Sequence, residues 1–164
     1  RELFSLEPRY LSPKDLNYIL PNQGVPEFAF VGRSNVGKSS LINALLGCGP
    51  KSKLVRISKE PGCTKNVNYF SFSRKDKPNS HVLHLVDLPG YGFAKQSKQE
   101  QKKWEEMITA FLLSRDQSVM RRTFMLVDSR LPIKESDKKM MDVISKAKLP
   151  FQVILTKSDQ TSQP

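Results

Sequence analysis

The chain carries, from Phe28 to Leu41, the sequence Phe-Ala-Phe-Val-Gly-Arg-Ser-Asn-Val-Gly-Lys-Ser-Ser-Leu. Its first four residues form a short apolar run that is typical of a buried strand. Its last residues open a helical pattern, with Leu41, Ala44 and Leu45 on one face and Gly47 as the stop. Between the two stands Gly-x-x-x-x-Gly-Lys-Ser, which has the spacing of a phosphate-binding loop. The stretch therefore predicts a strand, an anion-binding loop and a helix.

Each fixed position of this loop has a chemical reason. Backbone N–H groups at a helix N-terminus bind polyphosphate charge, and Gly32 and Gly37 permit the turn and the close approach. Lys38 is placed to reach the β- and γ-phosphate oxygens, and the Ser39 hydroxyl is placed to bind Mg²⁺. A chance match in a Gly/Ser loop is the alternative, which the flanking strand and helix disfavour.

Length and composition fit a single globular domain of 164 residues, 38% of them hydrophobic and 26% charged. Lys and Arg number 27 against 16 Asp and Glu, and the net charge of +11 favours a polyanionic partner. A solvated basic surface explains that charge equally well. Cys48 and Cys63 lack zinc or disulfide spacing, so we expect a reducing compartment. No apolar run approaches the roughly 18 residues of a membrane span.

The first 27 residues predict an extended N-terminal arm, because four prolines disfavour a long helix. These are Pro8, Pro13, Pro21 and Pro26. One short turn is expected at Lys14 to Leu20. Because the first residue is Arg1 rather than Met, we expect a processed or trimmed chain.

Two strand-like runs, Asn68 to Phe72 and His81 to Val86, predict an antiparallel hairpin with a charged connection from Ser73 to Ser80. His81 and His84 are expected on opposite faces of the second strand, as ordinary polar positions rather than ligands.

The second half of the chain alternates strands with amphipathic helices. Thr123 to Val127 and Phe151 to Leu155 read as strands, and Ser97 with Glu100 forms a capping box. The predicted core positions of the two helices are Trp104, Ile108, Phe111 and Leu112, then Ile133, Met140, Met141, Ile144 and Ala147. This alternation predicts an α/β fold with ligands at the carboxyl ends of the strands.

Three further motifs are expected at that edge. Thr64 of Pro61-Gly62-Cys63-Thr64 offers a hydroxyl to Mg²⁺ and an N–H to a γ-phosphate. Asp87 of Asp87-Leu88-Pro89-Gly90 is placed to hold Mg²⁺ through water, and Gly90 to donate its N–H to the γ-phosphate. In Thr156-Lys157-Ser158-Asp159, the Asp159 carboxylate accepts two hydrogen bonds from guanine that adenine does not offer.

Together, Gly-Arg-Ser-Asn-Val-Gly-Lys-Ser-Ser-Leu, Pro-Gly-x-Thr, Asp-Leu-Pro-Gly-Tyr-Gly-Phe-Ala and Thr-Lys-Ser-Asp resemble the EngB/YihA family of P-loop GTPases, of the Era/TrmE type. The resemblance runs from about Phe28 to Asp159. It implies a Ras-like P-loop NTPase fold: a mostly parallel twisted sheet with one antiparallel hairpin strand and helices on both faces. It also implies GTP hydrolysis with Mg²⁺ and a role in assembly of the large ribosomal subunit, with septation or cell-cycle defects in bacteria on depletion.

Two departures from the family pattern are present. The family carries a further strand and helix, with a loop that touches guanine O6, whereas this chain stops at Pro164. We therefore expect an arm over 1–27, a G domain over 28–164 without its last strand and helix, and an apolar edge on the final strand. The charged connection from Ser73 to Ser80 is longer than in bacterial members, which points to a eukaryotic, organellar relative.

The resemblance and the residue chemistry give one expected site. The nucleotide contacts are Gly32, Arg33, Ser34, Asn35, Val36, Gly37, Lys38, Ser39, Ser40, Pro61, Gly62, Thr64, Asp87, Gly90, Thr156, Lys157 and Asp159. The groups expected to act in hydrolysis are Lys38, Thr64, Gly90 and Asn35. The expected metal ligands are Ser39, Thr64 and, through water, Asp87.

Tyr91 follows Asp-x-x-Gly, where Ras-like enzymes place the glutamine that orients the attacking water. A phenol does not do that job in the same geometry, so slow unaided hydrolysis is expected. In some related GTPases an asparagine at the position of Asn35 binds K⁺, which the resemblance extends to Asn35. Tolerance of a tight loop is the equal alternative for this residue.

The function expected is a GTP-binding and GTP-hydrolysing switch with GTP/GDP and ribosomal RNA or the large subunit as partners, in a monomer. Two alternatives stay open: a GTP-dependent interaction module in division with little turnover, and a P-loop phosphotransferase. An intracellular, soluble location is expected, in the cytoplasm or an organelle matrix such as the mitochondrial one. Two basic groups flank the nucleotide motifs: Lys51, Lys53, Arg56, Lys59 and Lys65, and Lys95, Lys98, Lys102 and Lys103.

Overall fold

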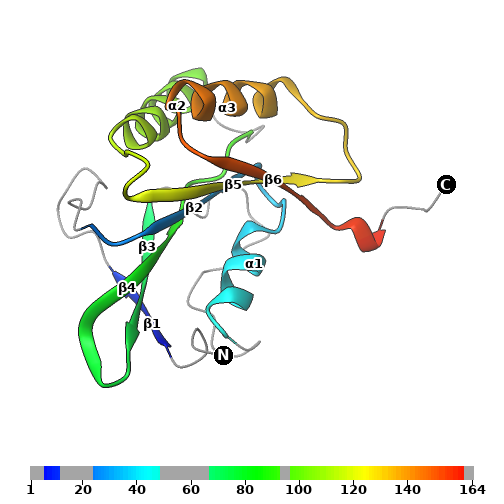
Figure 1. Ribbon diagram of the computed structural model, residues 1–164. Helices are drawn as coiled ribbons and strands as arrows, with labels where there is room; N and C mark the ends of the chain where they lie inside the picture. The colour runs from blue at the N-terminus through cyan, green and yellow to red at the C-terminus, as the bar shows by residue number, and fades with distance from the viewer. Residues whose placement is uncertain (1–5, 12–23, 49–66, 93–96, 161–164) are drawn as a thin grey trace.

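The computed structural model describes residues 6–11, 24–48, 67–92 and 97–160, which contain a six-stranded sheet of order β1-β3-β4-β2-β5-β6 (Figure 1). The strands are β1 (Leu6–Leu11), β2 (Glu27–Gly32), β3 (Asn68–Arg74), β4 (Lys77–Asp87), β5 (Met120–Asp128) and β6 (Phe151–Thr156). Parallel pairing joins β4, β2, β5 and β6, whereas β3 is antiparallel to both β4 and β1. This confirms the predicted sheet with one antiparallel hairpin strand.

Helices cover both faces of the sheet, as predicted. α1 (Lys38–Leu45) lies on one face, and α2 (Lys98–Leu113) and α3 (Glu135–Lys146) lie on the other (Figure 1). β2 serves both cores because successive side chains of a strand point to opposite faces. Ala29 and Val31 pack in the core with α2 and α3, whereas Phe30 packs in the core with α1. Burial on both faces explains why this strand reads as a continuous apolar run.

The start and the buried face of α2 agree with the sequence. Ser97 Oγ accepts a hydrogen bond from the Glu100 N–H at 3.2 Å, and the Glu100 carboxylate accepts one from the Ser97 N–H at 2.9 Å, which completes the capping box. Ile108 and Phe111 are buried, and Trp104 is half-buried against the same core. The aromatic residues of this helix are therefore core residues.

Two details of the other helices differ from expectation. Ile42 of α1 and Leu46 at its C-cap are buried, and the predicted Leu41 packs partly against the same core, whereas the predicted Leu45 is 49% exposed. Ile133 precedes α3 and is 55% exposed, while Met140 of the same predicted face is buried. Helical spacing alone gives several possible faces, and contact with the sheet decides which of them is buried.

The β3–β4 hairpin corrects two predictions. The strands continue through the predicted connection, so that Arg74 pairs with Lys77 across a short turn. The pairing passes from Phe72–Leu83 to Ser73–His81, which leaves Val82 as an extra residue in β4.

This bulge reverses the alternation of side chains along β4, and His81 and His84 therefore lie together instead of on opposite faces. Their ring centroids are 5.7 Å apart, and His81 Nδ1 lies 2.6 Å from Ser71 Oγ. His84 is buried, and burial, followed by the nearby His81 and Arg115, lowers the pKa of His84 to about 4.

β1 lies at one edge of the sheet and β6 at the other. Within the described residues of the predicted arm, Leu6–Leu11 forms β1, which pairs with β3, and Pro8 suits such an edge strand. The turn predicted at Lys14 to Leu20 lies outside the described residues. Among the strands described, β6 pairs with β5 alone, and Val153 (40% exposed) and Leu155 (63% exposed) form the apolar edge that the sequence predicted. The division into an arm and a G domain stays a prediction.

The packing of α2 gives a stability prediction. Ile108→Ala should lower the free energy of unfolding by about 2–5 kcal/mol, because Ile108 is fully buried and its loss leaves a cavity. Leu113→Ala on the same helix should change it by no more than about 0.5 kcal/mol, because Leu113 is 59% exposed. Urea denaturation of the two variants measures both values, and equal losses would contradict the packing of α2 described here.

Candidate nucleotide-binding site

The predicted phosphate loop joins β2 to α1 and has the conformation that an anion cradle requires. Asn35 (φ 62°) and Gly37 (φ 102°) both have left-handed backbone conformations, and the latter is readily adopted only by glycine. Gly32 allows the loop to fold back, because a Cβ there would lie 2.8 Å from Val36 Cγ1 and 3.0 Å from the Leu126 carbonyl oxygen. The local sequence therefore fixes a tight loop at the carboxyl end of β2.

Lys38 and Asp87, predicted to hold phosphate and metal, meet at this edge. Lys38 is the first residue of α1, Asp87 is the last residue of β4, and the ammonium group contacts the carboxylate in a buried ion pair. Burial raises the pKa of the Asp87 carboxyl above its ordinary value, and the Lys38 charge opposes that shift. The pair brings two separate motifs into direct contact.

The residues present fit Mg²⁺. The second carboxylate oxygen of Asp87, Oδ2, is buried and has no hydrogen-bond partner within the described part of the chain. Ser39 follows Lys38 in α1 and is half-buried. No group of three or more His, Cys, Asp or Glu side chains gathers among the described residues. The Asp87 carboxylate oxygen and the Ser39 hydroxyl are oxygen donors of the kind that Mg²⁺ prefers.

Gly90 and Tyr91 lie beside the phosphate loop. The Ser34 N–H donates to the Tyr91 carbonyl at 3.0 Å, and the Tyr91 N–H donates to the Gly32 carbonyl at 3.3 Å. A Cβ on Gly90 would lie 3.4 Å from the Gly32 carbonyl oxygen and 3.5 Å from the Ser34 nitrogen. The structure therefore brings Gly90 next to the phosphate loop, as the sequence motifs predicted.

The Tyr91 side chain is buried, and its contacts lie on α2 and α3. Its hydroxyl donates to Asp137 Oδ1 at 2.8 Å, and its ring lies 5.9 Å from the Trp104 ring. Asp137, which is 1% exposed, also accepts from the Lys134 N–H at 2.8 Å and lies 3.6 Å from Arg33 Nη1. Tyr91 and Arg33 are thus both held by the start of α3, a connection that the sequence did not reveal.

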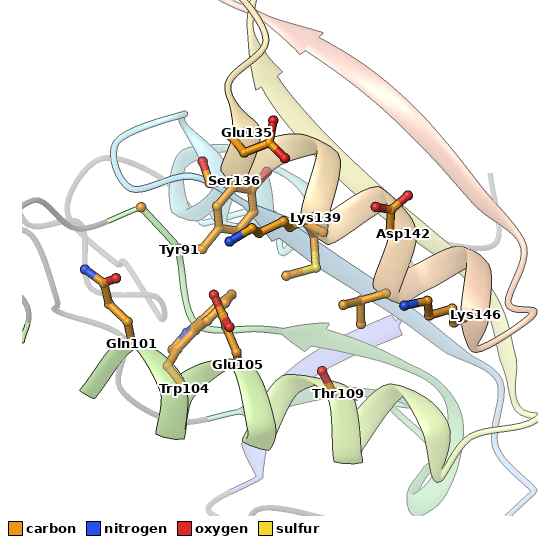
Figure 2. A pocket seen from close by; sticks show the side chains of 13 residues that line it. Tyr91, Gln101, Trp104, Glu105, Thr109, Glu135, Ser136, Lys139, Asp142 and Lys146 are labelled. Atoms are coloured by element: carbon orange, nitrogen blue, oxygen red, sulfur yellow. The ribbon is translucent and has the colours of Figure 1, made fainter. Parts of the chain in front are cut away.

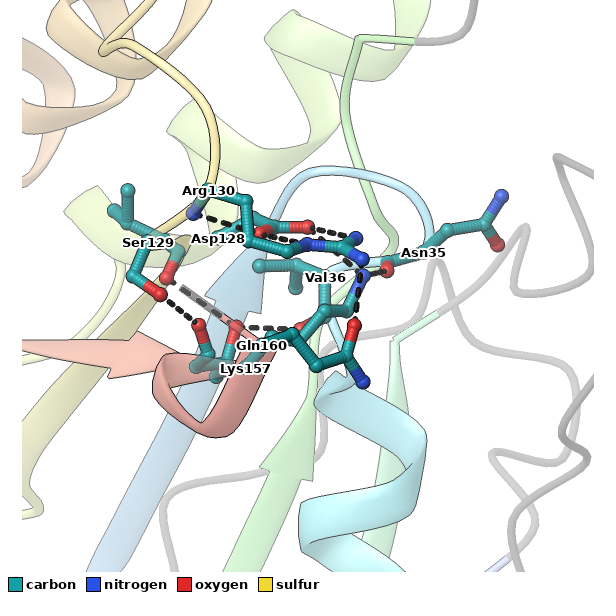
Figure 3. A network of polar contacts seen from close by, with 9 residues as sticks. Asn35, Val36, Asp128, Ser129, Arg130, Lys157 and Gln160 are labelled. Carbon is teal, nitrogen blue, oxygen red and sulfur yellow. Dashed lines mark hydrogen bonds and ion pairs between the residues drawn. The ribbon is translucent and has the colours of Figure 1, made fainter. Parts of the chain in front are cut away.

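The Thr-Lys-Ser-Asp motif begins at Thr156, the last residue of β6, and contacts the phosphate loop (Figure 3). Thr156 Oγ1 donates to the Val36 carbonyl at 2.7 Å, and Lys157 Nζ donates to the Asn35 carbonyl at 2.6 Å. The Asn35 side chain is exposed and points away from this network. The positive φ of Asn35 supports its role in the tight loop, while K⁺ binding stays a prediction.

Asp128 and Arg130 belong to the same network, although sequence reasoning assigned them no role. The Asp128 carboxylate accepts hydrogen bonds from Lys157 Nζ at 2.8 Å and from Arg130 Nε and Nη2 at 2.9 Å each. The Arg130 hydrogen bonds, and after them Lys157, hold the pKa of Asp128 well below its ordinary range despite some desolvation. Only the position of Asp128 at a strand end pointed to it in the sequence.

Asp159 lies in η2 (Ser158–Gln160), a 3₁₀ turn that follows Lys157. Its side chain is exposed at the same edge of the sheet, which is compatible with reading a base. Ser40, the remaining predicted contact of the first motif, is exposed on α1. Pro61, Gly62 and Thr64 of the second motif lie outside the described residues, so their assignment stays a prediction.

A separate groove of about 440 Å³ runs between α2 and α3 (Figure 2). It begins at Tyr91 and has Trp104 and Met140 among its apolar lining residues. Its polar side chains have mixed charge and include Glu105 and Lys139. The groove adjoins the nucleotide site at Tyr91 but does not include its phosphate-binding residues.

Comparisons with known proteins agree with this geometry. The family model described as "50S ribosome-binding GTPase" matches residues 27–157. A relative from Gluconobacter oxydans, "Probable GTP-binding protein EngB", is 46% identical over 141 residues, which cover 86% of this chain and 57% of the relative. A relative from Bartonella quintana with the same description is 44% identical and covers 88% of this chain and 66% of its own length. The chain thus spans about six-tenths of these relatives.

A solved structure gives the same result. The crystal structure of a probable GTP-binding protein engB superposes with a TM-score of 0.60 at 26% identity, covering 84% of this chain and 73% of that one. Within the residues described, no helix has the length and apolar character needed to cross a membrane. The match over most of the chain, the level of identity and the shared fold lead to one conclusion: the chain belongs to the EngB family of P-loop GTPases.

Proposed function

We propose that this chain binds GTP and GDP with Mg²⁺, hydrolyses GTP slowly and acts as a switch in assembly of the large ribosomal subunit. The observation that carries the proposal is the meeting of Lys38, Asp87 and the left-handed phosphate loop at the carboxyl edge of the sheet. These are the groups that a nucleoside triphosphate and its metal require. Family membership and the description of the family model support the same proposal.

We assign each residue of the site a role that its position supports. The loop amides bind the phosphates, and Lys38 exchanges its contact with Asp87 for the β- and γ-phosphate oxygens. Mg²⁺, when held by Ser39 and through water by Asp87, would neutralise phosphate charge. Gly90, beside the loop, supplies an N–H to the γ-phosphate, and Thr64 remains the predicted sensor of the same group.

Two features support slow hydrolysis. Tyr91 occupies the position of the water-orienting glutamine, yet its hydroxyl is bound to Asp137 and its ring is buried. Arg33 is held by the same carboxylate, so neither side chain is directed to an attacking water by its present contacts. We propose that K⁺ beside Asn35 helps to neutralise the negative charge that develops on the phosphates during hydrolysis.

The proposed partner is ribosomal RNA within the large subunit. Lys102 and Lys103 are exposed on the first turns of α2, close in sequence to the segment that follows Gly90. The contact of Lys102 with Glu106 spans 3.8 Å between two exposed side chains, and such a pair holds the lysine only weakly. The bacterial relatives support the proposal of a cytoplasmic location, and a monomer is proposed as the acting form.

Base selection is tested by Asp159→Asn. The change should weaken GTP binding by about 1 to 3 kcal/mol and improve binding of xanthosine triphosphate, because it inverts one donor–acceptor pair at the base. Titration calorimetry with both nucleotides measures the effect, with Asp76→Asn in the exposed β3–β4 turn as the matched control. If Asp159→Asn binds GTP as tightly as the parent, Asp159 does not read the base.

The phosphate end is tested by Lys38→Ala. This variant should lose GTP binding, and its free energy of unfolding should fall by about 3–5 kcal/mol because the buried Asp87 loses its counter-charge. Lys139→Ala, an exposed lysine on α3, is the control for both measurements. Retained GTP affinity in Lys38→Ala would remove Lys38 from the site.

The partner is tested by charge reversal on α2. The double variant Lys102→Glu, Lys103→Glu should flatten the salt dependence of binding to large-subunit particles. The slope of the logarithm of the binding constant against the logarithm of salt concentration should fall by about 0.7 to 0.9 for each phosphate that the variant no longer neutralises. GTP affinity should stay unchanged. Lys75→Glu with Lys77→Glu at the β3–β4 turn is the matched control. Filter binding at several salt concentrations gives the slopes, and an unchanged slope in the α2 variant would rule out this face.

A further inference from the structure

We infer that Asp128 is a positioning residue for the bound nucleotide. It holds Lys157 across the phosphate loop and, through Arg130, it holds the turn that carries Asp159. The inference rests on the proposed binding of guanine nucleotides. Asp128 lies outside the four nucleotide motifs, yet it contacts one of them directly and reaches a second through Lys157. Its role would therefore be to join the phosphate end of the site to the base end.

The Asp128 carboxylate is built to hold two cations at once. It closes β5 and its side chain is 9% exposed, so little water competes for its oxygens. Oδ1 accepts from Arg130 Nε at 2.9 Å and from the Arg130 N–H at 3.1 Å. Oδ2 accepts from Arg130 Nη2 at 2.9 Å and from Lys157 Nζ at 2.8 Å. A neutral amide has only one oxygen and could not accept this set.

The contact with Lys157 supports the phosphate loop. Lys157 Nζ lies between Asp128 Oδ2, at 2.8 Å, and the Asn35 carbonyl oxygen, at 2.6 Å. Lysine has a flexible stem, and holding its ammonium at two acceptors removes much of that freedom before a ligand arrives. Lys157 (φ 58°) and Asn35 (φ 62°) both have left-handed backbones, which persist only when their surroundings hold them. Asp128 supplies part of that support.

The contact with Arg130 supports the base-reading turn. The guanidinium binds Asp128 through two nitrogens, and its third nitrogen, Nη1, donates to Gln160 Oε1 at 2.6 Å. Gln160 is the neighbour of Asp159 in η2, and its N–H also donates to the Lys157 carbonyl at 3.0 Å. Arg130 thereby links the end of β5 to the turn that would contact the base (Figure 3).

This arrangement predicts which property of the protein depends on Asp128. A nucleotide must contact the phosphate loop and the 3₁₀ turn together, and Asp128 lowers the entropic cost of holding both in place. The γ-phosphate chemistry is assigned to Lys38 and Asp87, which form a separate pair. Loss of Asp128 should therefore weaken GDP and GTP equally and appear in KM rather than in kcat.

The experiment compares Asp128→Asn with the parent, using GDP and a non-hydrolysable GTP analogue in titration calorimetry. Both dissociation constants should rise by about tenfold to a hundredfold, as expected for loss of charge-assisted hydrogen bonds. Asp142→Asn on α3, an exposed aspartate, is the matched control. Thermal unfolding without nucleotide shows whether each variant is folded.

A double-mutant cycle separates positioning from general destabilisation. If part of the effect of Asp128 passes through Lys157, Asp128→Asn should cause a smaller loss of affinity in a Lys157→Ala background than in the parent. Arg130→Gln leaves the contact between Asp128 and Lys157 in place and should retain more nucleotide affinity than Asp128→Asn. It also provides a test if Asp128→Asn does not fold. Three results would overturn the inference: nucleotide affinity like that of the parent in a folded Asp128→Asn variant, additive losses of affinity in the cycle, or a greater loss of affinity in Arg130→Gln than in Asp128→Asn. A parent that does not bind GTP would instead overturn the proposed function.

Discussion

The buried contact between Lys38 and Asp87 couples the phosphate loop to the centre of the sheet. The two side chains are 7% and 0% exposed and come from the start of α1 and the end of β4. Removing two charges from water is costly, and well-packed apolar residues in their place are often equally or more stabilising. The pair therefore fits the phosphate- and metal-binding roles proposed for the two residues better than a role in stabilising the fold.

The sequence predicted those parts of the fold in which a local pattern has one structural solution. The strand, loop and helix around Gly37 follow from spacing, and the capping box at Ser97 follows from two side chains three residues apart. The pairing of β1 with β3 was not predicted, because it depends on a partner about 60 residues away. The bulge at Val82 was missed because alternation assumes regular pairing.

In the candidate site too, the positions that belong to a local motif were predicted, and the contacts between distant residues were not. The structure brings motif residues such as Lys38 and Gly90 to the phosphate loop, as their fixed spacings predicted, and their roles toward a nucleotide stay predictions. The contacts of Asp128 and Asp137 with the motif residues were missed because each partner is distant in the sequence: Lys157 is 29 residues from Asp128, and Tyr91 is 46 residues from Asp137. A carboxylate at the end of a strand, or one in the first turn of a helix, has no local pattern that identifies its partner. The partner becomes evident only when the fold brings the two residues together.

The bulge in β4 has a consequence for the behaviour of the protein in acid. It holds His84 in a buried site beside His81, where the pKa of His84 is about 4 instead of its ordinary 6.5. Between these two pH values the unfolded chain binds a proton that the folded chain rejects. The contribution of His84 to stability is complete above pH 6.5, declines as the pH falls and is lost near pH 4. Burial of His84, with the neighbouring His81 that the bulge brings to the same face, thus makes the hairpin that carries Asp87 sensitive to protons.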